Sequence, residues 1–230
     1  MNRKTFHNLL ILALMLQGLI GFSQNDFITW SQSQFGVEHK ASPRYSIDFS
    51  LRSRYVVYDE NGLQFRQLLL ELTHFSSFKI NNNQTASLGI NLRNRSWFDP
   101  GSNEIRLTEA YEIKSKKSVW RHSHRFRIEQ RFYEGFTNFR ERYQYAVDFP
   151  LKGPTLEVGE PFLYGAVEGL LTLNKDRAPR FNERTTVVIG WKLTKKLTIF
   201  AGPTLDYQIR TRHYDQQNVL FILTAAVLKI

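Results

Sequence analysis

The chain of 230 residues contains no cysteine. This absence excludes a disulfide framework, a thiolate metal site and a lipid anchor attached to a cysteine. The part after residue 23 also lacks a sustained helical period, a Pro/Gly/Ser-rich linker and a repeat of fixed length. We therefore expect one all-β domain rather than several units.

A hydrophobic run long enough for a membrane-spanning helix is missing as well. The longest apolar run lies between Leu9 and Ile20 and follows the basic Arg3 and Lys4. It holds about a dozen apolar residues, fewer than the roughly 20 that a spanning helix needs. A small-residue site follows it at Ser23, so we predict a signal peptide over residues 1–23 and a mature domain over residues 24–230.

Acidic residues are outnumbered by basic ones, and the formal charge is +10. Loss of the signal peptide removes Arg3 and Lys4 and no acidic residue. In an exported chain, this basic balance favours an electropositive lumen or contact with anionic lipid head groups, and not a nucleic-acid partner.

The most informative segment is residues 124–132. Arg125, Arg127, Glu129 and Arg131 alternate there with Phe126, Ile128 and Phe132. A period of two is typical of a strand whose side chains point to opposite faces. Such a charged face suits the polar interior of a barrel whose outside is apolar and meets lipid.

The same alternation recurs along the chain between turns rich in Gly, Pro, Asn and Asp. It predicts about eleven strands, which are roughly 11–16 residues long and so exceed the usual length of strands in soluble sheets. Their predicted ranges are 26–40, 45–57, 65–80, 87–98, 105–114, 124–132, 139–149, 162–173, 181–193, 197–212 and 218–230.

Together these strands predict an antiparallel transmembrane β-barrel of 10–12 strands with short periplasmic turns. Bacterial single-chain barrels have even strand counts, so we favour twelve, with ten and a first segment outside the wall as alternatives. Aromatic residues near the predicted strand ends match the girdles of such barrels. They include Trp30, Trp97, Trp120 and Trp191. The alternative fold is a soluble periplasmic ligand-binding β-barrel or a β-sandwich.

The chain also resembles a known family, the small outer-membrane barrels of Bacteroidota catalogued as domain of unknown function 2490. The resemblance begins at Asp26-Phe27-Ile28-Thr29-Trp30. It continues through residues 125–132 and 140–143, Glu168, residues 182–184 and the hairpin over residues 190–197. It implies an outer-membrane barrel in a Gram-negative bacterium and supplies no catalytic residues. The last residues, Leu228-Lys229-Ile230, depart from the aromatic ending usual in the family.

The candidate site is a row of inward-facing charges. Its residues are Arg93, Arg95, Arg125, Arg127, Glu129, Arg131, Arg140, Arg142, Glu168 and Arg184, joined by Arg52, Arg54, Glu71 and Asp206. One interpretation is a structural ion-pair network that fills the lumen, because buried charges need partners. The others are a narrow anion-favouring pore and a site for an acidic sugar or a lipid phosphate.

No catalytic constellation is recognisable. His122-Ser123-His124 is the best place for a lipid hydrolase or acyltransferase site, but alternation puts Ser123 opposite both histidines. We therefore predict a non-enzymatic structural barrel or narrow pore, with a lipid-modifying enzyme as the alternative. No cofactor and no metal is expected. The expected partners are outer-membrane lipid and small anionic solutes, and the sequence sets no oligomeric state.

Overall fold

The computed structural model describes residues 27–95, 103–210 and 216–230, so the predicted signal peptide and Trp97 lie outside the described residues. Within these ranges no helix is present that could span a membrane. The described chain forms eleven strands: β1 (Phe27–His39), β2 (Tyr45–Asp59), β3 (Gly62–Lys79), β4 (Gln84–Asn94), β5 (Glu104–Lys117), β6 (Trp120–Tyr133), β7 (Phe136–Pro150), β8 (Pro161–Asn174), β9 (Arg180–Lys192), β10 (Leu197–Arg210) and β11 (Gln216–Lys229).

The predicted alternation determines which side chains point inward. In β6, Phe126 and Ile128 are 48% and 50% exposed, whereas Glu129 and Arg131 are 1% and 3% exposed. The same inversion, with charges inside and apolar side chains outside, holds along the neighbouring strands. The all-β fold is therefore confirmed, and the strands lie close to their predicted ranges.

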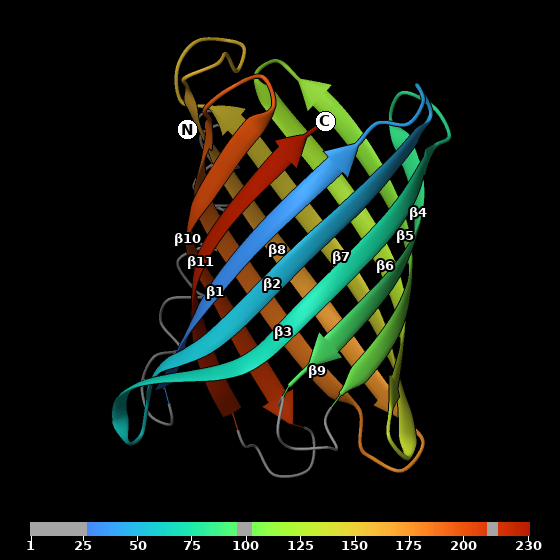
Figure 1. Cartoon of the computed structure of the whole chain (residues 1–230), viewed down its shortest axis with the longest axis vertical. Helices are drawn as coiled ribbons and strands as arrows, with labels where there is room; N and C mark the ends of the chain where they lie inside the picture. Colours follow the sequence, from blue (N-terminus) through green and yellow to red (C-terminus); the bar gives the residue numbers. More distant parts are fainter. Residues whose placement is uncertain (1–26, 96–102, 211–215) are drawn as a thin grey trace, which may run out of the picture.

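The eleven strands close into a single barrel, because β1 pairs with β11 (Figure 1). This closing pair is parallel and runs in register from Phe27 and Asn218 to Glu38 and Lys229. The other neighbouring strands in the barrel are antiparallel. The preference for twelve strands was wrong. A parallel pair satisfies both edge strands and so closes an odd-numbered sheet without a further strand.

An odd number of strands places the two ends of the described chain at opposite ends of the barrel. β1 starts at the lower end in Figure 1, and β11 finishes at the upper end. The strand connections at the upper end include the longest described one, residues 151–160 between β7 and β8. The lower end holds the two-residue turn of Glu134 and Gly135, where Gly135 has a φ of 82°. A residue without a Cβ atom favours that backbone conformation.

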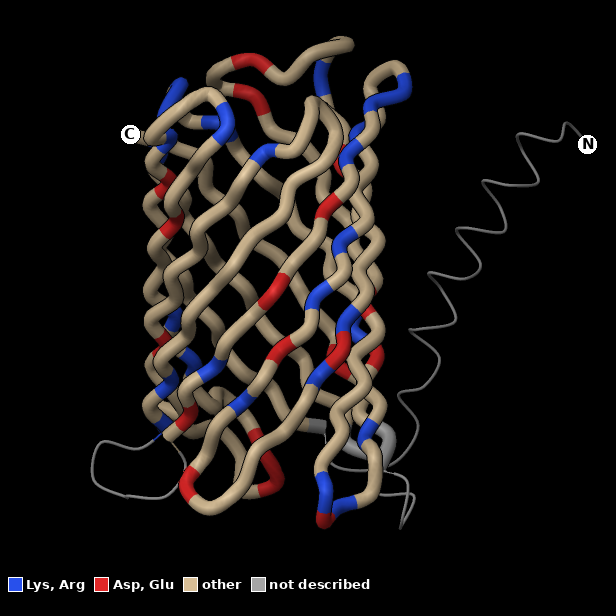
Figure 2. Tube along the Cα trace, turned by 90° about the vertical axis from the view of Figure 1, so that its right-hand side faces the viewer, with Lys and Arg blue, Asp and Glu red and all other residues tan. Residues whose placement is uncertain are grey.

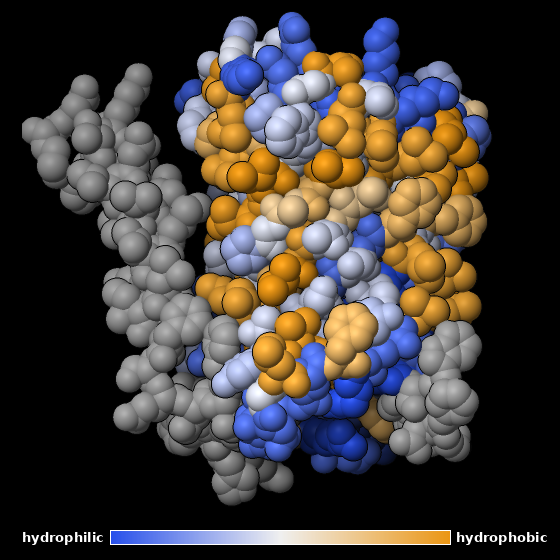
Figure 3. Space-filling model, turned by 60° about the vertical axis from the view of Figure 1, so that its left-hand side comes forward, coloured by the Kyte–Doolittle hydropathy of each residue, from blue (hydrophilic) through white to orange (hydrophobic). Residues whose placement is uncertain are grey.

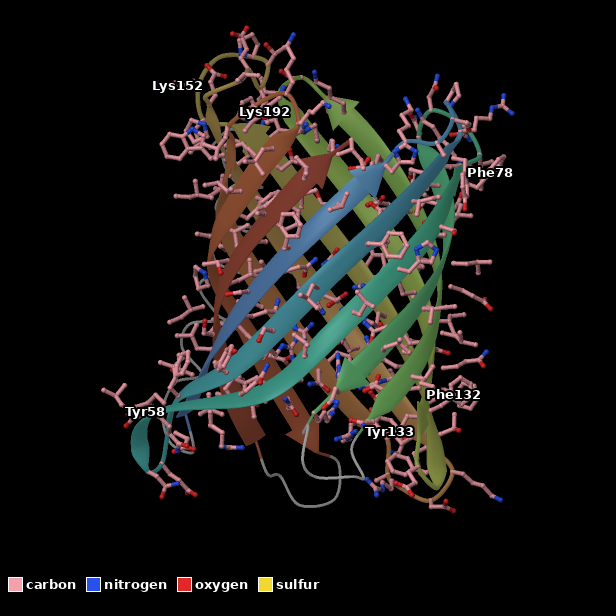
Figure 4. The ribbon with its side chains drawn as sticks, viewed as in Figure 1. Tyr58, Phe78, Phe132, Tyr133, Lys152 and Lys192 are labelled. Atoms are coloured by element: carbon pink, nitrogen blue, oxygen red, sulfur yellow. The ribbon has the colours of Figure 1, made fainter. Side chains whose placement is uncertain are left out.

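The outer wall is largely apolar. Phe49, Leu88 and Ile189 are 52%, 65% and 51% exposed. Apolar side chains cover much of the upper wall in Figure 3, whereas hydrophilic ones lie at both ends and over part of the lower wall. Phe78 near the upper end and Phe132 near the lower end point away from the barrel (Figure 4). Because the inner face is polar, this fold has the reverse of a soluble barrel's pattern of exposure.

Aromatic residues do lie near strand ends, as expected, but Trp30, near the start of β1, does not face outward. Trp120 contacts Phe149 near the upper end, and Tyr133 stacks on Phe136 near the lower end. Trp30 instead contacts the buried Phe221 edge to face, with ring centroids 5.2 Å apart. Trp30 therefore packs on the inner side of the wall.

The parallel closure can be tested by cross-linking. Ser33 and Thr224 are register partners, and their hydroxyl oxygens lie 3.0 Å apart. In the double variant Ser33→Cys/Thr224→Cys we expect a disulfide to form under mild oxidation, because paired strands bring the Cα atoms within bonding range. The native chain contains no cysteine, so no other thiol can compete for the cross-link. The measurement is the gel mobility of the heat-denatured protein with and without reductant.

The matched control is Ser33→Cys/Leu220→Cys. Leu220 lies four residues from Thr224 on the same strand, which is about 13 Å at roughly 3.3 Å per residue. Equal cross-linking of both pairs, or of neither, would contradict the parallel register.

Candidate functional site

The sequence-predicted charges lie together on the inner face of the barrel, where most of them line one cavity. Figure 2 shows basic and acidic positions close together along the lower half of the strands. Buried members include Arg93, Glu129, Arg131 and Glu168, with exposed fractions of 9% or less. Arg95 lies nearer the lower mouth, where its side chain is 38% exposed. All the residues of the predicted row therefore take part in one polar interior, although they differ in their partners.

Glu104 is the most connected acidic residue of this interior. Its Oε1 atom accepts hydrogen bonds from Arg106 Nη2 at 2.6 Å and from Arg131 Nε at 2.7 Å. Its Oε2 atom accepts from Tyr133 at 2.8 Å and from Arg93 Nη1 at 3.3 Å. The Glu104 side chain has no exposed surface. Its charge is therefore stabilised by several charge-assisted hydrogen bonds rather than by water.

Three other carboxylates continue these contacts around the barrel. Glu129 Oε1 accepts a hydrogen bond from Arg142 Nη1 at 2.7 Å, and Glu168 Oε2 accepts one from Arg142 Nη2 at 2.6 Å. Glu168 also pairs with Arg127. Arg184 lies 3.6 Å from Glu168 and pairs with Asp206. Arg142 and Arg184 thus each link two carboxylates.

The charges join into one continuous chain, which we call the ion-pair belt. In order around the barrel it consists of Arg52, Glu71, Arg93, Glu104, Arg106, Glu129, Arg142, Glu168, Arg184 and Asp206. It crosses every strand from β2 to β10. Gln34 on β1 extends it by accepting hydrogen bonds from Arg52 Nε and Nη2 at 3.0 and 2.8 Å.

Strand register produces much of the belt directly. Glu71 lies opposite Arg52 on one neighbouring strand and opposite Arg93 on the other. Arg184 likewise lies opposite both Glu168 and Asp206. Side chains directly opposite each other on one face of a sheet are within contact distance. A shift of one residue in any of these pairings would move a charge to the apolar outer face.

Sequence reasoning missed two members of the belt, Glu104 and Arg106. The predicted strand began at Ile105, so that no inward charge was assigned to this segment. The signal was present, because Glu104, Arg106 and Thr108 alternate with the exposed Ile105 and Leu107. The predicted strand after the Gly- and Asn-containing turn starts at Ile105, whereas the observed strand already includes Glu104.

Three inward arginines pair with no carboxylate of the described residues. Arg54 Nε donates to Gln32 at 2.7 Å, Arg125 Nη2 to Gln144 at 2.6 Å, and Arg140 Nε to Thr172 at 2.7 Å. Arg54 also lies over the Phe221 ring, 4.7 Å from its centroid. Each guanidinium has five N–H donors, so most of their donors have no acceptor among the described residues.

These arginines line a cavity of about 370 Å³ inside the barrel. Its wall contains nine arginines and three glutamates. Above it lies a vestibule of about 740 Å³, which shares Phe75, Arg125 and Arg127 with the cavity and includes Lys40, Lys79 and Lys114. The vestibule also includes Glu38, Asp48 and Glu112, but its basic residues outnumber these acidic ones. An anion that enters from the upper end would therefore meet a net positive charge.

A large depression of the described surface lies on the outer wall. Its volume is about 940 Å³, and apolar side chains dominate its lining. Glu109 and Glu141 flank Ile128 within it, one on each neighbouring strand. Apart from these carboxylates the groove offers few hydrogen-bonding groups, so the lumen is the stronger candidate for a polar ligand.

The histidines of residues 122–124 pair with tyrosines. His122 Nδ1 lies 2.8 Å from the Tyr145 hydroxyl, and His124 Nδ1 lies 2.9 Å from the Tyr143 hydroxyl. Ser123 is in register with the buried Ala146, on the opposite face of the sheet. The part of the chain that the structure describes contains no cluster of three or more His, Cys, Asp or Glu side chains that could hold a metal ion.

Fold and site together define a closed β-barrel with an apolar exterior and an ion-paired lumen. The chain belongs to the family described as "Protein of unknown function (DUF2490)", whose profile matches residues 27–218. This match supports the resemblance to this family that the sequence shows. Searches of the curated proteins and of the solved structures found no match.

The ion-pair belt predicts a large effect of Glu104→Gln. The substitution keeps the shape of the side chain but leaves three buried guanidinium groups short of a negative partner. Removing one member of a buried ion pair typically costs about 3–5 kcal/mol. We therefore expect a clearly lower urea midpoint for the refolded protein in detergent micelles.

Glu60→Gln is the control for this substitution, because Glu60 is exposed in the turn between β2 and β3. It removes the same charge and should leave the midpoint nearly unchanged. Equal midpoints for the Glu104 variant and the native protein would show that the belt does not stabilise the barrel.

Proposed function

We propose that this protein is an integral barrel of the outer membrane of a Gram-negative bacterium and that its role is not enzymatic. The lower part of its lumen is closed by the ion-pair belt, so the barrel does not act as an open channel. The observation that carries this proposal is the pairing of an apolar exterior with a buried ionic interior.

The exterior supports the membrane part of the proposal. Large apolar side chains such as Phe35, Leu92 and Ile222 are 48–50% exposed on the outer face of their strands. Exposed apolar area on this scale is unusual for a monomeric soluble protein and typical of a surface that meets lipid or a partner. Closure also satisfies the backbone groups of every strand, which the hydrocarbon core of a bilayer requires.

The ion-pair belt supports the closed lumen. Below the cavity, Glu104, Arg106 and Arg131 are 2%, 6% and 3% exposed. Solvent therefore reaches almost none of the side chains across the lower part of the lumen. A hydrated ion would need these pairs to separate before it could pass.

The signal peptide predicted over residues 1–23 supports export, and the cysteine-free sequence is compatible with any oxidising compartment. The histidine pairs contribute to the outer aromatic surface rather than to a nucleophile, since Ser123 faces the other way. These features favour the structural barrel over a lipid-modifying enzyme.

Insertion and conductance test the proposal in one preparation. The refolded mature protein should show heat-modifiable gel migration, remain in liposomes after alkaline washing, and give no stepped currents in a planar bilayer. A protein that stays monodisperse without detergent would overturn the membrane assignment. Stepped currents from inserted protein would overturn the closed lumen, and anion selectivity in a salt gradient would then identify a narrow pore.

A further inference from the structure

The cavity in the barrel lumen has a surplus of hydrogen-bond donors at one place and unsatisfied acceptors beside them. The donors belong to Arg127 and Arg140, and the acceptors to Glu129 and Asn91. All four residues line the cavity. A ligand that fits this set must accept several hydrogen bonds and also donate at least one.

The two arginines are placed to hold an anion. Arg127 pairs with Glu168 through Nη2, but its buried Nε atom has no acceptor. Arg140 uses its Nε atom for Thr172, and neither terminal nitrogen reaches a carboxylate among the described residues. Guanidinium groups match the geometry of oxyanions and bind them through paired N–H donors.

Strand register places one of the two acceptors, Glu129, next to these arginines. Glu129 lies directly opposite Arg140 and two residues from Arg127 on the same face of β6. Its Oε2 atom is buried and accepts no hydrogen bond, and the same is true of Asn91 Oδ1. Arg106 Nε lies 3.7 Å from this Oε2 atom, beyond hydrogen-bond distance. An unsatisfied buried carboxylate oxygen is costly unless a donor reaches it.

We infer that the cavity binds hydrogen phosphate, with Arg127 and Arg140 donating to its oxygen atoms and Glu129 accepting its P–OH proton. This inference deepens the proposed function, because it assigns a ligand to the closed lumen. A volume of about 370 Å³ exceeds the roughly 30 Å³ of one water molecule many times, so the ion fits with water around it. It reaches the site through the vestibule at the upper end.

The P–OH group of the ligand makes the inference specific for hydrogen phosphate over sulfate. Sulfate has the same shape and charge as hydrogen phosphate, but it carries no proton near neutral pH. Its oxygen atoms would therefore face Glu129 Oε2 without a donor between them. A site that places a carboxylate oxygen against the ligand rejects an analogue that lacks the matching hydroxyl, because the buried acceptor is left unpaired.

The experiment is anion titration of the refolded mature protein in detergent micelles, followed by isothermal calorimetry and by the unfolding temperature. Inorganic phosphate should bind saturably, and sulfate at equal ionic strength should bind at least tenfold more weakly. Sodium chloride at the same ionic strength measures general screening. Equal effects of phosphate and sulfate, or a phosphate effect no larger than that of chloride, would overturn the inference.

Two substitutions locate the site. Arg140→Gln should weaken phosphate binding at least tenfold and leave the phosphate-free protein as stable as the native one or more so, because it relieves repulsion among unpaired arginines. Lys116→Gln removes the same charge from an exposed position near the upper end and should change neither quantity. Unchanged phosphate affinity in the Arg140 variant would refute the placement.

The titration does not depend on membrane insertion or on conductance. Binding in micelles with failed insertion would reject the proposed function and keep the site. Correct insertion without saturable phosphate binding would do the reverse. If Arg140→Gln does not refold, the phosphate and sulfate comparison on the native protein still decides the question.

Discussion

The structure depends on one electrostatic constraint, the need of charges withdrawn from water to find partners. Five buried carboxylates, Glu71, Glu104, Glu129, Glu168 and Asp206, meet this need through the arginines of neighbouring strands. Because each arginine reaches two strands, the pairs join into a belt and do not remain isolated. The belt therefore acts as the polar part of a core that also contains nine buried apolar side chains among the described residues.

The belt also explains why the strand register is so well defined. An apolar exterior alone tolerates shifts of two residues, which keep every side chain on its own face. The charges are less tolerant, because a shift of two residues would separate Glu71 from both Arg52 and Arg93, or Arg184 from Asp206. Hydrophobic patterning thus selects the face, and ion pairing selects the register within that face.

The excess of arginine over acidic residues gives the lumen a property that a neutral filling would lack. Arg54, Arg125 and Arg140 lie around the cavity without a carboxylate of their own among the described residues, and the rim above is also basic. A purely structural core would gain nothing from such unpaired cations. Their position at the inner end of a vestibule is instead what binding of an anion would require.

The alternation of residues such as Arg125 to Phe132 was enough to predict an all-β barrel, its inverted polarity and most inward charges, because side-chain direction in a strand follows residue number. Local pattern could not reveal the parallel pairing of β1 with β11, which joins residues about as far apart in sequence as the chain allows. It also could not distinguish Arg142, which bridges two carboxylates, from Arg140, which has none, since both occupy inward positions. Only the tertiary structure decides this, because partners are set by the stagger of neighbouring strands around the closed barrel.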